Sequence, residues 1–531
     1  MTKIKRPAVI FAIVIFLSSV LFYYLNSYFR FSARGFIIFC ASVFAVISLL
    51  FFVIFKKFKT ITTLFLIFTV LYPCVIQFIS AKRAENFTNR FSGEHEYTFV
   101  VDKAAGSDKV NFIFTKPVMC DGEKIKDGEK VFFTASLKLA PQVGDAFSIR
   151  AVICPVSDEN LEKYNFFVNK TYLFSNGTFL LLAGSENEKI VFERGKEEDL
   201  TFREKCCVRF QRCLKENTEN AGPDVYGIAK AIVLGDRSSV SSNIKNYFKI
   251  CGVLPYLAVS GLHVLILITF LSFFLRTVFG NTRAMYVLII AFALFYMMLL
   301  SFSASVTRAC VMAICLYCGK LLRRTSDSVN AIAVSLIILV TINPMCVFDA
   351  GMALSYLATI GIICSSELLK PIFSVVTSPV YKKITKLIES FVMSFYASTF
   401  TIPVVAHGFG YFSMLAPIVS LIMAFPFSVA MSFVVLMYFF SFLNIKFLID
   451  ACVCVFSVSI NFIISVVRFF SNESYMFIPC DISQIMLLLF FVLYFILFLS
   501  FARARERAQV SVSAGIFMTG AAFIIYSSAV A

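Results

Sequence analysis

Long apolar runs separated by short basic turns dominate the chain and predict membrane-spanning helices. A run of about 18 to 20 apolar residues can cross the hydrocarbon core of a bilayer. The runs predict a polytopic α-helical membrane protein with about 13 spans. They lie near 7–27, 34–55, 60–80, 253–275, 285–301, 304–321, 328–342, 348–365, 389–407, 412–440, 446–470, 484–501 and 510–529. The run 412–440 contains Pro417 and Pro426, so it predicts either one kinked helix or two broken ones.

A different pattern occupies residues 81–198. Short stretches of alternating apolar and polar residues, such as EYTFVVD and KVFFTASLKL, are separated by Asp-Gly and Gly-Asp turns. Period-two alternation with such turns is typical of β-hairpins. Five or six short strands over this length predict a small all-β domain, an OB-like barrel. The periodicity alone fits a β-sandwich nearly as well.

These patterns divide the chain into four segments. N-terminal membrane helices occupy 1–80, the OB-like β domain 81–198, an amphipathic helical linker 199–251 and a transmembrane channel domain 252–531. The linker interleaves apolar and basic residues, so it could lie on the membrane surface or pack over the polar domain. Basic residues near the spans place the N-terminus in the cytoplasm and the β domain outside the cell.

Composition supports a membrane protein but gives little evidence for a nucleic-acid partner. The chain is 59% hydrophobic and 15% charged, whereas a soluble domain is roughly a quarter charged. Its formal charge of +16 is concentrated around the membrane runs, where positive-inside topology places basic residues. The β domain is slightly acidic, which argues against tight nonspecific binding of phosphates.

Cysteine and histidine do not predict a metal site or a cofactor. Most of the 16 cysteines lie in apolar runs, and the CxxC pair Cys315 and Cys318 has no second pair to complete a zinc site. Only three histidines are present. Cys120 and Cys154 could form a disulfide in an oxidising compartment, and unpaired thiols are the alternative.

The stretch 234–264 carries the most informative chemistry. Asp236 and Arg237 precede an apolar run, and Ser260 and His263 lie within it. Polar groups in a span usually face the protein interior or a wet path. Asp236 and Arg237 could instead form a local ion pair with a helix cap. Ser260 and His263 lie on one helical face and are expected to reach each other poorly, so a lining role is favoured over nucleophilic catalysis.

Further polar positions follow in the later runs. Arg308 lies in or at the rim of a span, where it could neutralise Asp236 or Asp349, contact a phosphate, or snorkel to the interface. Asp349 precedes a segment rich in small residues, which predicts a helix cap followed by a close packing face. Pro403 and the turn at 407–413 predict a helix end and a loop.

Several of these segments resemble the competence proteins of the ComEC type in order and spacing. The resemblance covers about 225–440. It rests on LGDRS at 234–238, LAVSGLHV at 257–264, SVTRACVM at 305–312, DAGMALSYLATIG at 349–361 and IPVVAHGFGYFS at 402–413. The motif LAVSGLHV is the most specific of these. Ser420 stands where the family usually has Asn, and the chain contains no HxHxDH motif of the metallo-β-lactamase-like domain found in many members.

The resemblance implies a channel that imports single-stranded DNA across the cytoplasmic membrane during natural transformation. The residues implied to line the DNA path are Asp236, Arg237, Ser260, His263 and Arg308. Those implied to support the channel are Gly235, Gly261, Asp349, Gly351, Ser355, Pro403 and Gly410. Membrane lipid, a DNA receptor, a cytoplasmic DNA translocase and a separate nuclease are the implied partners.

On this basis the chain is expected to be a transport channel and not an enzyme, with no nuclease activity. Two other functions stay open at this point. One is transport of another anionic solute on the same scaffold. The other is a membrane-embedded hydrolase that uses Asp236, Ser260 and His263. The sequence gives neither the oligomeric state, the strand polarity nor the energy source.

Overall fold

A computed structural model describes residues 7–29 and 60–479, apart from 92, 107–109, 126–128, 137–142, 164–169, 185–192, 195–199, 219–220, 238, 325–326, 374–378 and 473–476. The runs predicted to span at 34–55, 484–501 and 510–529 lie outside the described residues. The chain forms two compact units. One comprises Met1–Lys205 and Val329–Asp349, and the other comprises Cys206–Ser328 and Ala350–Ala531.

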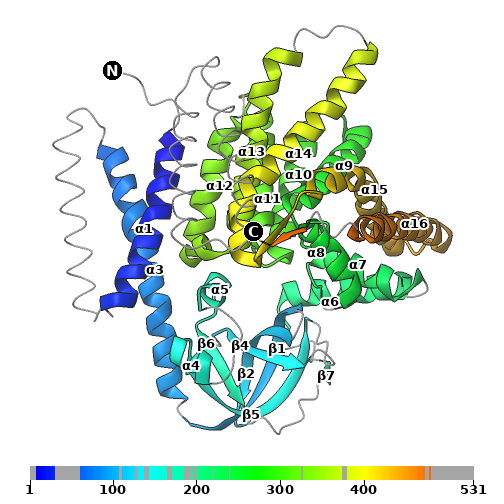
Figure 1. Cartoon of the computed structure of the whole chain (residues 1–531). Helices are drawn as coiled ribbons and strands as arrows, with labels where there is room; N and C mark the ends of the chain where they lie inside the picture. The colour runs from blue at the N-terminus through cyan, green and yellow to red at the C-terminus, as the bar shows by residue number, and fades with distance from the viewer. Residues whose placement is uncertain are drawn as a thin grey trace. The chain divides into compact units, whose positions relative to one another are not determined.

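The first unit contains a closed β-barrel (Figure 1). Its strand order is β1-β2-β4-β6-β5, and β5 pairs with β1 to close the ring. Neighbouring strands are antiparallel except β4 and β6, which are parallel. A small β barrel is therefore confirmed. The strands are β1 (His95–Gly106), β2 (Val110–Cys120), β3 (Glu123–Lys124), β4 (Val131–Ser136), β5 (Asp145–Pro155), β6 (Leu180–Gly184) and β7 (Glu193–Arg194).

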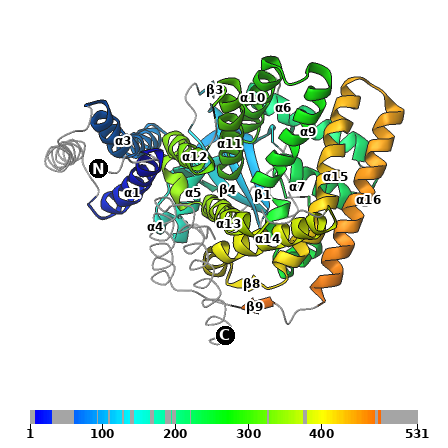
Figure 2. The same ribbon diagram turned by 90° about the horizontal axis from the view of Figure 1, so that it is seen from above.

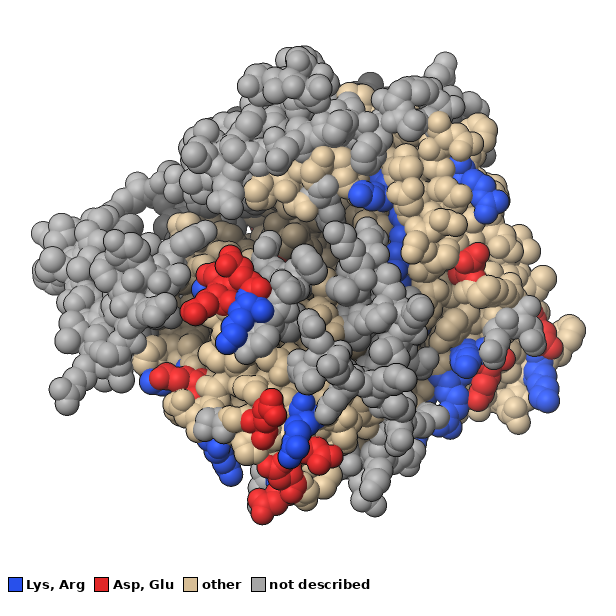
Figure 3. All heavy atoms as spheres, turned by 60° about the horizontal axis from the view of Figure 1, so that its bottom comes forward, with Lys and Arg blue, Asp and Glu red and all other residues tan. Residues whose placement is uncertain are grey.

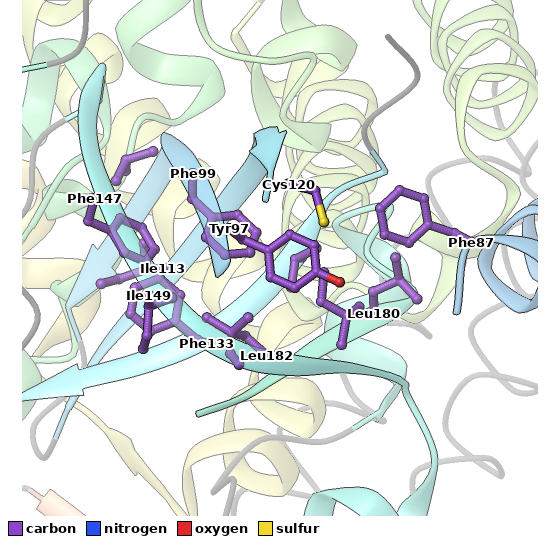
Figure 4. Packing of buried hydrophobic residues seen from close by; sticks show 14 of the residues in the cluster. Phe87, Tyr97, Phe99, Ile113, Cys120, Phe133, Phe147, Ile149, Leu180 and Leu182 are labelled. Carbon is purple, nitrogen blue, oxygen red and sulfur yellow. The ribbon is translucent and has the colours of Figure 1, made fainter. Parts of the chain in front are cut away.

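Alternating side chains of these strands fill the barrel, as the period-two pattern requires. Phe99 stacks on Phe147 with ring centroids 5.3 Å apart, and Phe133 lies 4.9 Å from Phe147. Figure 4 shows these rings together with aliphatic side chains from the neighbouring strands. Tyr97 and Phe99 are fully buried. This aromatic core holds the strands of the barrel in place.

Helices complete the first unit. Gln77 of α3 (Thr60–Arg90) donates a hydrogen bond of 3.2 Å to the Ser19 carbonyl of α1 (Pro7–Phe29). Asn343 donates a hydrogen bond of 2.7 Å to the Ser175 carbonyl, which ties the later segment of the unit to the barrel segment. The remaining helices are α4 (Asp158–Lys163), α5 (Lys170–Ser175), α12 (Ser328–Ile342) and the 3₁₀ helix η3 (Pro344–Phe348).

The second unit is built almost entirely of helices. Helices α13 and α14 lie side by side, as do α15 and α16 (Figure 2). The elements are α6 (Phe202–Thr218, from Cys206 on), α7 (Pro223–Leu234), α8 (Ser242–Ile250), η2 (Leu254–Leu257), α9 (Gly261–Phe279), α10 (Arg283–Leu299), α11 (Ala304–Leu321), α13 (Ala350–Phe373), α14 (Pro379–Phe409), α15 (Ala416–Phe442) and α16 (Lys446–Ser471), with the short strands β8 (Tyr411–Ser413) and β9 (Phe477–Pro479).

Within the described part of the chain, five helices are long and apolar enough to cross a membrane. They contain Gly261–Phe279, Ala304–Leu321, Ile388–Gly408, Ala416–Phe442 and Lys446–Ser471. Only 28–33% of each apolar window is buried within the protein, so most of its surface is available to lipid. Four shorter apolar helices accompany them. The chain is therefore a mostly helical membrane protein.

One helix boundary differs from the sequence predictions. The helix predicted from residue 253 begins only at Gly261, because Pro255 and the Ser260 cap place a 3₁₀ turn before it. The span predicted at 389–407 agrees with the structure, since α14 runs through Pro403 and ends at Phe409, next to the predicted turn. In the run 412–440, Pro417 lies in the first turn of α15 and Pro426 in its interior, so this run forms one helix.

The linker segment from Cys206 on forms helices that pack on the second unit. Tyr438 of α15 donates a hydrogen bond of 3.0 Å to the Phe210 carbonyl of α6. The Cys251 thiol after α8 donates to the Val467 carbonyl of α16. Tyr296 of α10 donates to the Val233 carbonyl of α7. These contacts fix the loop that follows α7.

Charged side chains of both signs occur among the described residues on one face of the molecule. On the face shown in Figure 3, acidic and basic residues lie next to one another and do not form separate patches.

Candidate functional site in the helical unit

A buried ion pair joins α7 to the loop that follows it. The Lys230 Nζ lies 2.7 Å from Asp236 Oδ2, and the two side chains are 1% and 5% exposed. Ser239 Oγ lies 3.5 Å from the same Nζ. Ion pairing and hydrogen bonding are what permit charges to remain in a low-dielectric interior. Asp236 therefore pairs with Lys230, so it does not supply the neutralising partner considered for Arg308.

Two glycines allow this loop to fold back. Gly235 ends α7 in the left-handed conformation, with φ 75°, and its N–H donates to the Ala231 carbonyl. This is the usual glycine termination of a helix, and it returns Asp236 toward Lys230. Gly227 lies against the loop, where a Cβ atom would overlap the Ser239 carbonyl. The short distance between helix and loop therefore requires glycine.

Arg237 connects the loop to the next element. Its Nε donates a hydrogen bond of 3.1 Å to the Leu257 carbonyl at the end of η2. The loop after α7 is thus held immediately before the motif that begins α9. Asp236 and Arg237 consequently face different partners, Lys230 and Leu257, although they are adjacent in sequence.

Ser260 and His263 form a reciprocal cap at the start of α9. The Ser260 N–H donates to His263 Nδ1 at 3.0 Å, and Ser260 Oγ lies 2.7 Å from the same nitrogen. The Ser260 side chain also accepts the His263 backbone N–H, which completes a capping box. The expectation that the two side chains reach each other poorly is wrong, because Ser260 precedes the helix instead of projecting from it.

This geometry does not support the hydrolase alternative. His263 Nδ1 accepts the Ser260 backbone N–H, so the lone pair that would deprotonate Oγ is already engaged. The imidazole is fully buried and packs edge-on against Phe427, with ring centroids 4.7 Å apart. Asp236, the carboxylate that would orient it, is paired with Lys230. Nucleophile, base and carboxylate therefore do not form a catalytic chain here.

Arg308 of α11 lies against the first residue of α9. A Cβ atom at Gly261 would overlap Arg308 Nη2, so the guanidinium occupies the space that glycine leaves. Nη1 donates to the Thr359 hydroxyl of α13, and the guanidinium lies 5.9 Å from the Tyr356 ring centroid. The residue is 8% exposed, and its Nε has no hydrogen-bond partner. Among the described residues, no carboxylate forms an ion pair with Arg308.

The other predicted residues lie around this junction or away from it. Ser305 of α11 donates to the Gly351 carbonyl, and the Ser355 carbonyl accepts from Thr359. Both bonds link or brace α11 and α13. Asp349 precedes α13 and belongs to the other unit, where it interacts electrostatically with Lys103. Gly410 ends α14 with φ 74°. Their support of a channel stays a prediction.

Sequence reasoning missed three partners. A lone lysine inside the apolar helix 223–234 was a sufficient signal for Lys230, because such a charge requires a counter-ion. Thr359 and Tyr356 lie one helical turn apart in DAGMALSYLATIG, and only the packing of α13 against α11 brings them to Arg308. Neither the sequence of α11 nor that of α13 alone gives this pairing.

Known proteins resemble this region of the chain. The family model described as Competence protein matches residues 232–505, just over half of the chain. ComE operon protein 3 of Bacillus subtilis (strain 168) is 31% identical over 202 residues. That match covers 38% of this chain and 24% of the relative, so the chain aligns with about a quarter of that protein's length. No solved structure matches. The matched residues include Asp236, the Ser260–His263 cap and Arg308, and the chain belongs to the Competence protein family.

Proposed function

We propose that the helical unit conducts single-stranded DNA across the cytoplasmic membrane during natural transformation. Membership of the Competence protein family and the apolar helices support this function. A DNA strand carries one negative charge per nucleotide, so its route through a bilayer requires donors and positive charge. In this proposal Asp236, Arg237, Ser260, His263 and Arg308 belong to that route.

The environment of Arg308 is the observation that carries the proposal. Its guanidinium lies against Gly261, where the first-turn amides of α9 have no intrahelical acceptor. A helix N-terminus carries a partial positive charge, so it does not neutralise an arginine. Thr359 and the Tyr356 ring supply only a dipole and a quadrupole. A phosphodiester would supply the missing negative charge and accept from both groups.

Conduction requires a second arrangement of these helices. Asp236, His263 and Arg308 are 4%, 0% and 8% exposed, so they do not contact a strand in the present arrangement. In the proposal, movement of α9 relative to α11 opens the junction at Gly261 and Arg308. The half-buried residues 258–262 lie at this junction, where a small displacement would expose the α9 amides.

In this proposal the barrel is an OB-fold, and it lies outside the cell. Counting β1, β2, β4, β5 and β6 as consecutive strands, the ring order is one, two, three, five, four, closed by the first strand. This Greek-key order supports the OB assignment. Basic turns near the spans support an external barrel and a cytoplasmic N-terminus. A DNA receptor would then deliver the strand, and a cytoplasmic translocase would receive it.

Labelling with a membrane-impermeant thiol reagent tests this orientation. Glu162 of α4 and Arg324 after α11 are exposed, so a cysteine at either position can react. On intact cells, Glu162→Cys should add labelling above the parent protein, whereas Arg324→Cys should add labelling only after permeabilisation. The reverse pattern would invert the proposed topology.

Uptake of labelled DNA tests the function itself. In a deletion strain, the wild-type chain should restore cytoplasmic single strands, and Arg308→Gln should reduce uptake roughly tenfold or more, since a charged hydrogen bond to phosphate is lost. Arg308→Lys should recover part of the activity. Arg283→Gln is a matched control, because Arg283 is exposed at the start of α10. Normal uptake with Arg308→Gln at wild-type protein levels contradicts the proposal.

The same experiment separates DNA conduction from transport of another anion. Arg308 would serve any anionic solute equally well, so the residue does not choose between them. Cytoplasmic entry of labelled DNA that depends on this chain supports DNA as the cargo. Retention of DNA outside the cytoplasm, together with chain-dependent flux of a small anion in vesicles, would identify the alternative.

A further inference from the structure

Three side chains with metal-binding atoms meet at one end of the barrel. His95 begins β1, and Cys120 ends β2 opposite Tyr97 in the antiparallel register. Asp121 follows in a left-handed turn conformation with φ 48°. His95 Nδ1 lies 2.6 Å from Asp121 Oδ2, and Cys120 Sγ lies 3.9 Å from the same oxygen. The three ligand atoms all lie within 4.8 Å of one another.

An imidazole, a thiolate and a carboxylate are the ligands that zinc uses in proteins. In a tetrahedral site, ligand atoms about 2.0–2.3 Å from the ion lie about 3.3–3.6 Å from each other. The carboxylate oxygen and imidazole nitrogen must separate by roughly 0.7 Å, and the sulfur must approach by a few tenths of an ångström. Side-chain rotation alone can provide movements of this size, because Asp121 and His95 are partly exposed.

We propose that His95, Cys120 and Asp121 bind a zinc-like divalent cation, with water as the remaining ligand. This site is independent of the proposed DNA passage, since all three residues belong to the barrel unit. The bound ion would cross-link the start of β1 to the turn after β2. It would thereby stabilise the barrel and fix this edge in one arrangement.

The surroundings of the three residues favour an ion over a simple turn contact. The Glu96 backbone N–H donates to Asp121 Oδ1 at 2.9 Å, which orients the carboxylate and leaves Oδ2 directed at His95. The His95 ring lies edge-on to Tyr97, with centroids 6.0 Å apart, so an aromatic wall holds the imidazole. Asp121 is 54% exposed and gives an entry path, whereas Cys120 is buried. Figure 4 shows Cys120 beside Tyr97, on the side of that ring toward Phe87.

The alternative use of Cys120 is a disulfide with Cys154, and the strand register separates the two residues. Tyr97 of β1 pairs with Cys120 on one side and with Ile149 of β5 on the other. Cys154 lies further along β5, where it pairs with Leu181 of β6. Both thiols are free in the structure. Two strand spacings, about 10 Å, exceed the reach of a disulfide.

Cobalt titration of the purified full-length chain under reducing conditions tests this site. Co²⁺ bound to a thiolate gives a sulfur-to-metal charge-transfer band together with d–d bands of tetrahedral intensity. We expect one equivalent to bind, Zn²⁺ to displace it, and Zn²⁺ to raise the unfolding temperature of the barrel. Cys120→Ser should lose the charge-transfer band, because it removes the thiolate. His95→Gln should lose the tetrahedral d–d bands.

Cys154→Ser is the matched control, because Cys154 is the other cysteine of this barrel and is half-buried. It should retain the full cobalt spectrum. A spectrum that persists in Cys120→Ser, or no thiolate band in the wild-type chain, overturns the proposal. Hydrogen exchange of the barrel amides in each variant establishes that the barrel is folded, so loss of the cobalt spectrum reports on the ligands.

Discussion

Lys230 and Asp236 face each other inside the helical unit, with Nζ 2.7 Å from Oδ2 and both side chains nearly inaccessible. Removing one partner of such a pair leaves an uncompensated buried charge. We expect Asp236→Asn to lower the free energy of unfolding by about 3–5 kcal/mol. Thermal unfolding in detergent measures this loss.

The double variant Lys230→Met with Asp236→Leu separates stability from transport. Replacing both charges with apolar residues often restores the stability of a buried pair. We therefore expect normal unfolding but deficient DNA uptake, because the proposed path loses Asp236. Recovery of uptake together with stability would show that the pair serves folding alone.

Gly261 and Arg308 provide a second test at the junction of α9 and α11. In Gly261→Ala, the new methyl group overlaps the Arg308 guanidinium, which must move away from the α9 amides. Overpacking of this kind destabilises by roughly 1–3 kcal/mol. We expect reduced uptake and a lower unfolding temperature. Gly408→Ala is the matched control in α14, since a Cβ there meets no atom within 4 Å. An equal effect of both substitutions would contradict the packing argument.

Ser260 distinguishes a helix cap from a nucleophile. Loss of an N-cap side chain costs about 1 kcal/mol, so Ser260→Ala should lower stability modestly and leave partial uptake. Ser260→Asn should retain capping, because its amide oxygen accepts the His263 N–H and no anion is placed beside His263 Nδ1. A nucleophile would tolerate neither change. Complete loss of function in both variants, at normal stability, would revive the hydrolase alternative.

The sequence predicted the apolar helices well because length and hydropathy determine membrane insertion with little help from tertiary structure. The barrel was also predictable, since alternation and Asp-Gly turns are local signals. Pro403 lies inside the predicted span 389–407, where the length of the apolar run outweighs a local helix breaker. A proline usually ends a helix in water, but within a membrane unit the backbone has no water to replace its hydrogen bonds, so α14 continues.

The sequence predicted which residues belong to the candidate site, but it did not predict which partners they contact. The motifs identified Asp236, His263 and Arg308, each of which is buried in the structure. Their partners depend on long-range contacts. Asp236 returns to Lys230 only because Gly235 reverses the chain, and Arg308 meets Thr359 only because α11 packs on α13. The spacing of residues within one segment predicts neither of these two contacts.

The barrel unit contains a buried carboxylate whose titration yields a final prediction. Asp102 is surrounded by Lys130 at 2.8 Å, Lys116 at 3.9 Å and Arg203. Burial by itself would raise the pKa of Asp102, but these three cations outweigh it and lower the pKa from 3.8 to about 2. The folded state therefore holds the ionised carboxylate more strongly than the unfolded chain does.

A carboxyl group with a lowered folded-state pKa stabilises the fold above its unfolded pKa, and this contribution is lost as the pH falls from about 4 to 2. The shift corresponds to roughly 2 kcal/mol. Between about pH 4 and pH 2, we expect the unfolding free energy of the wild-type barrel to fall by roughly 2 kcal/mol more than that of Asp102→Asn. Asp158→Asn is the control, because Asp158 is 77% exposed and should match the wild-type profile. Hydrogen exchange of barrel amides measures the difference. If the unfolding free energies of wild type and Asp102→Asn changed with pH in parallel, the charge of Asp102 would not stabilise the barrel.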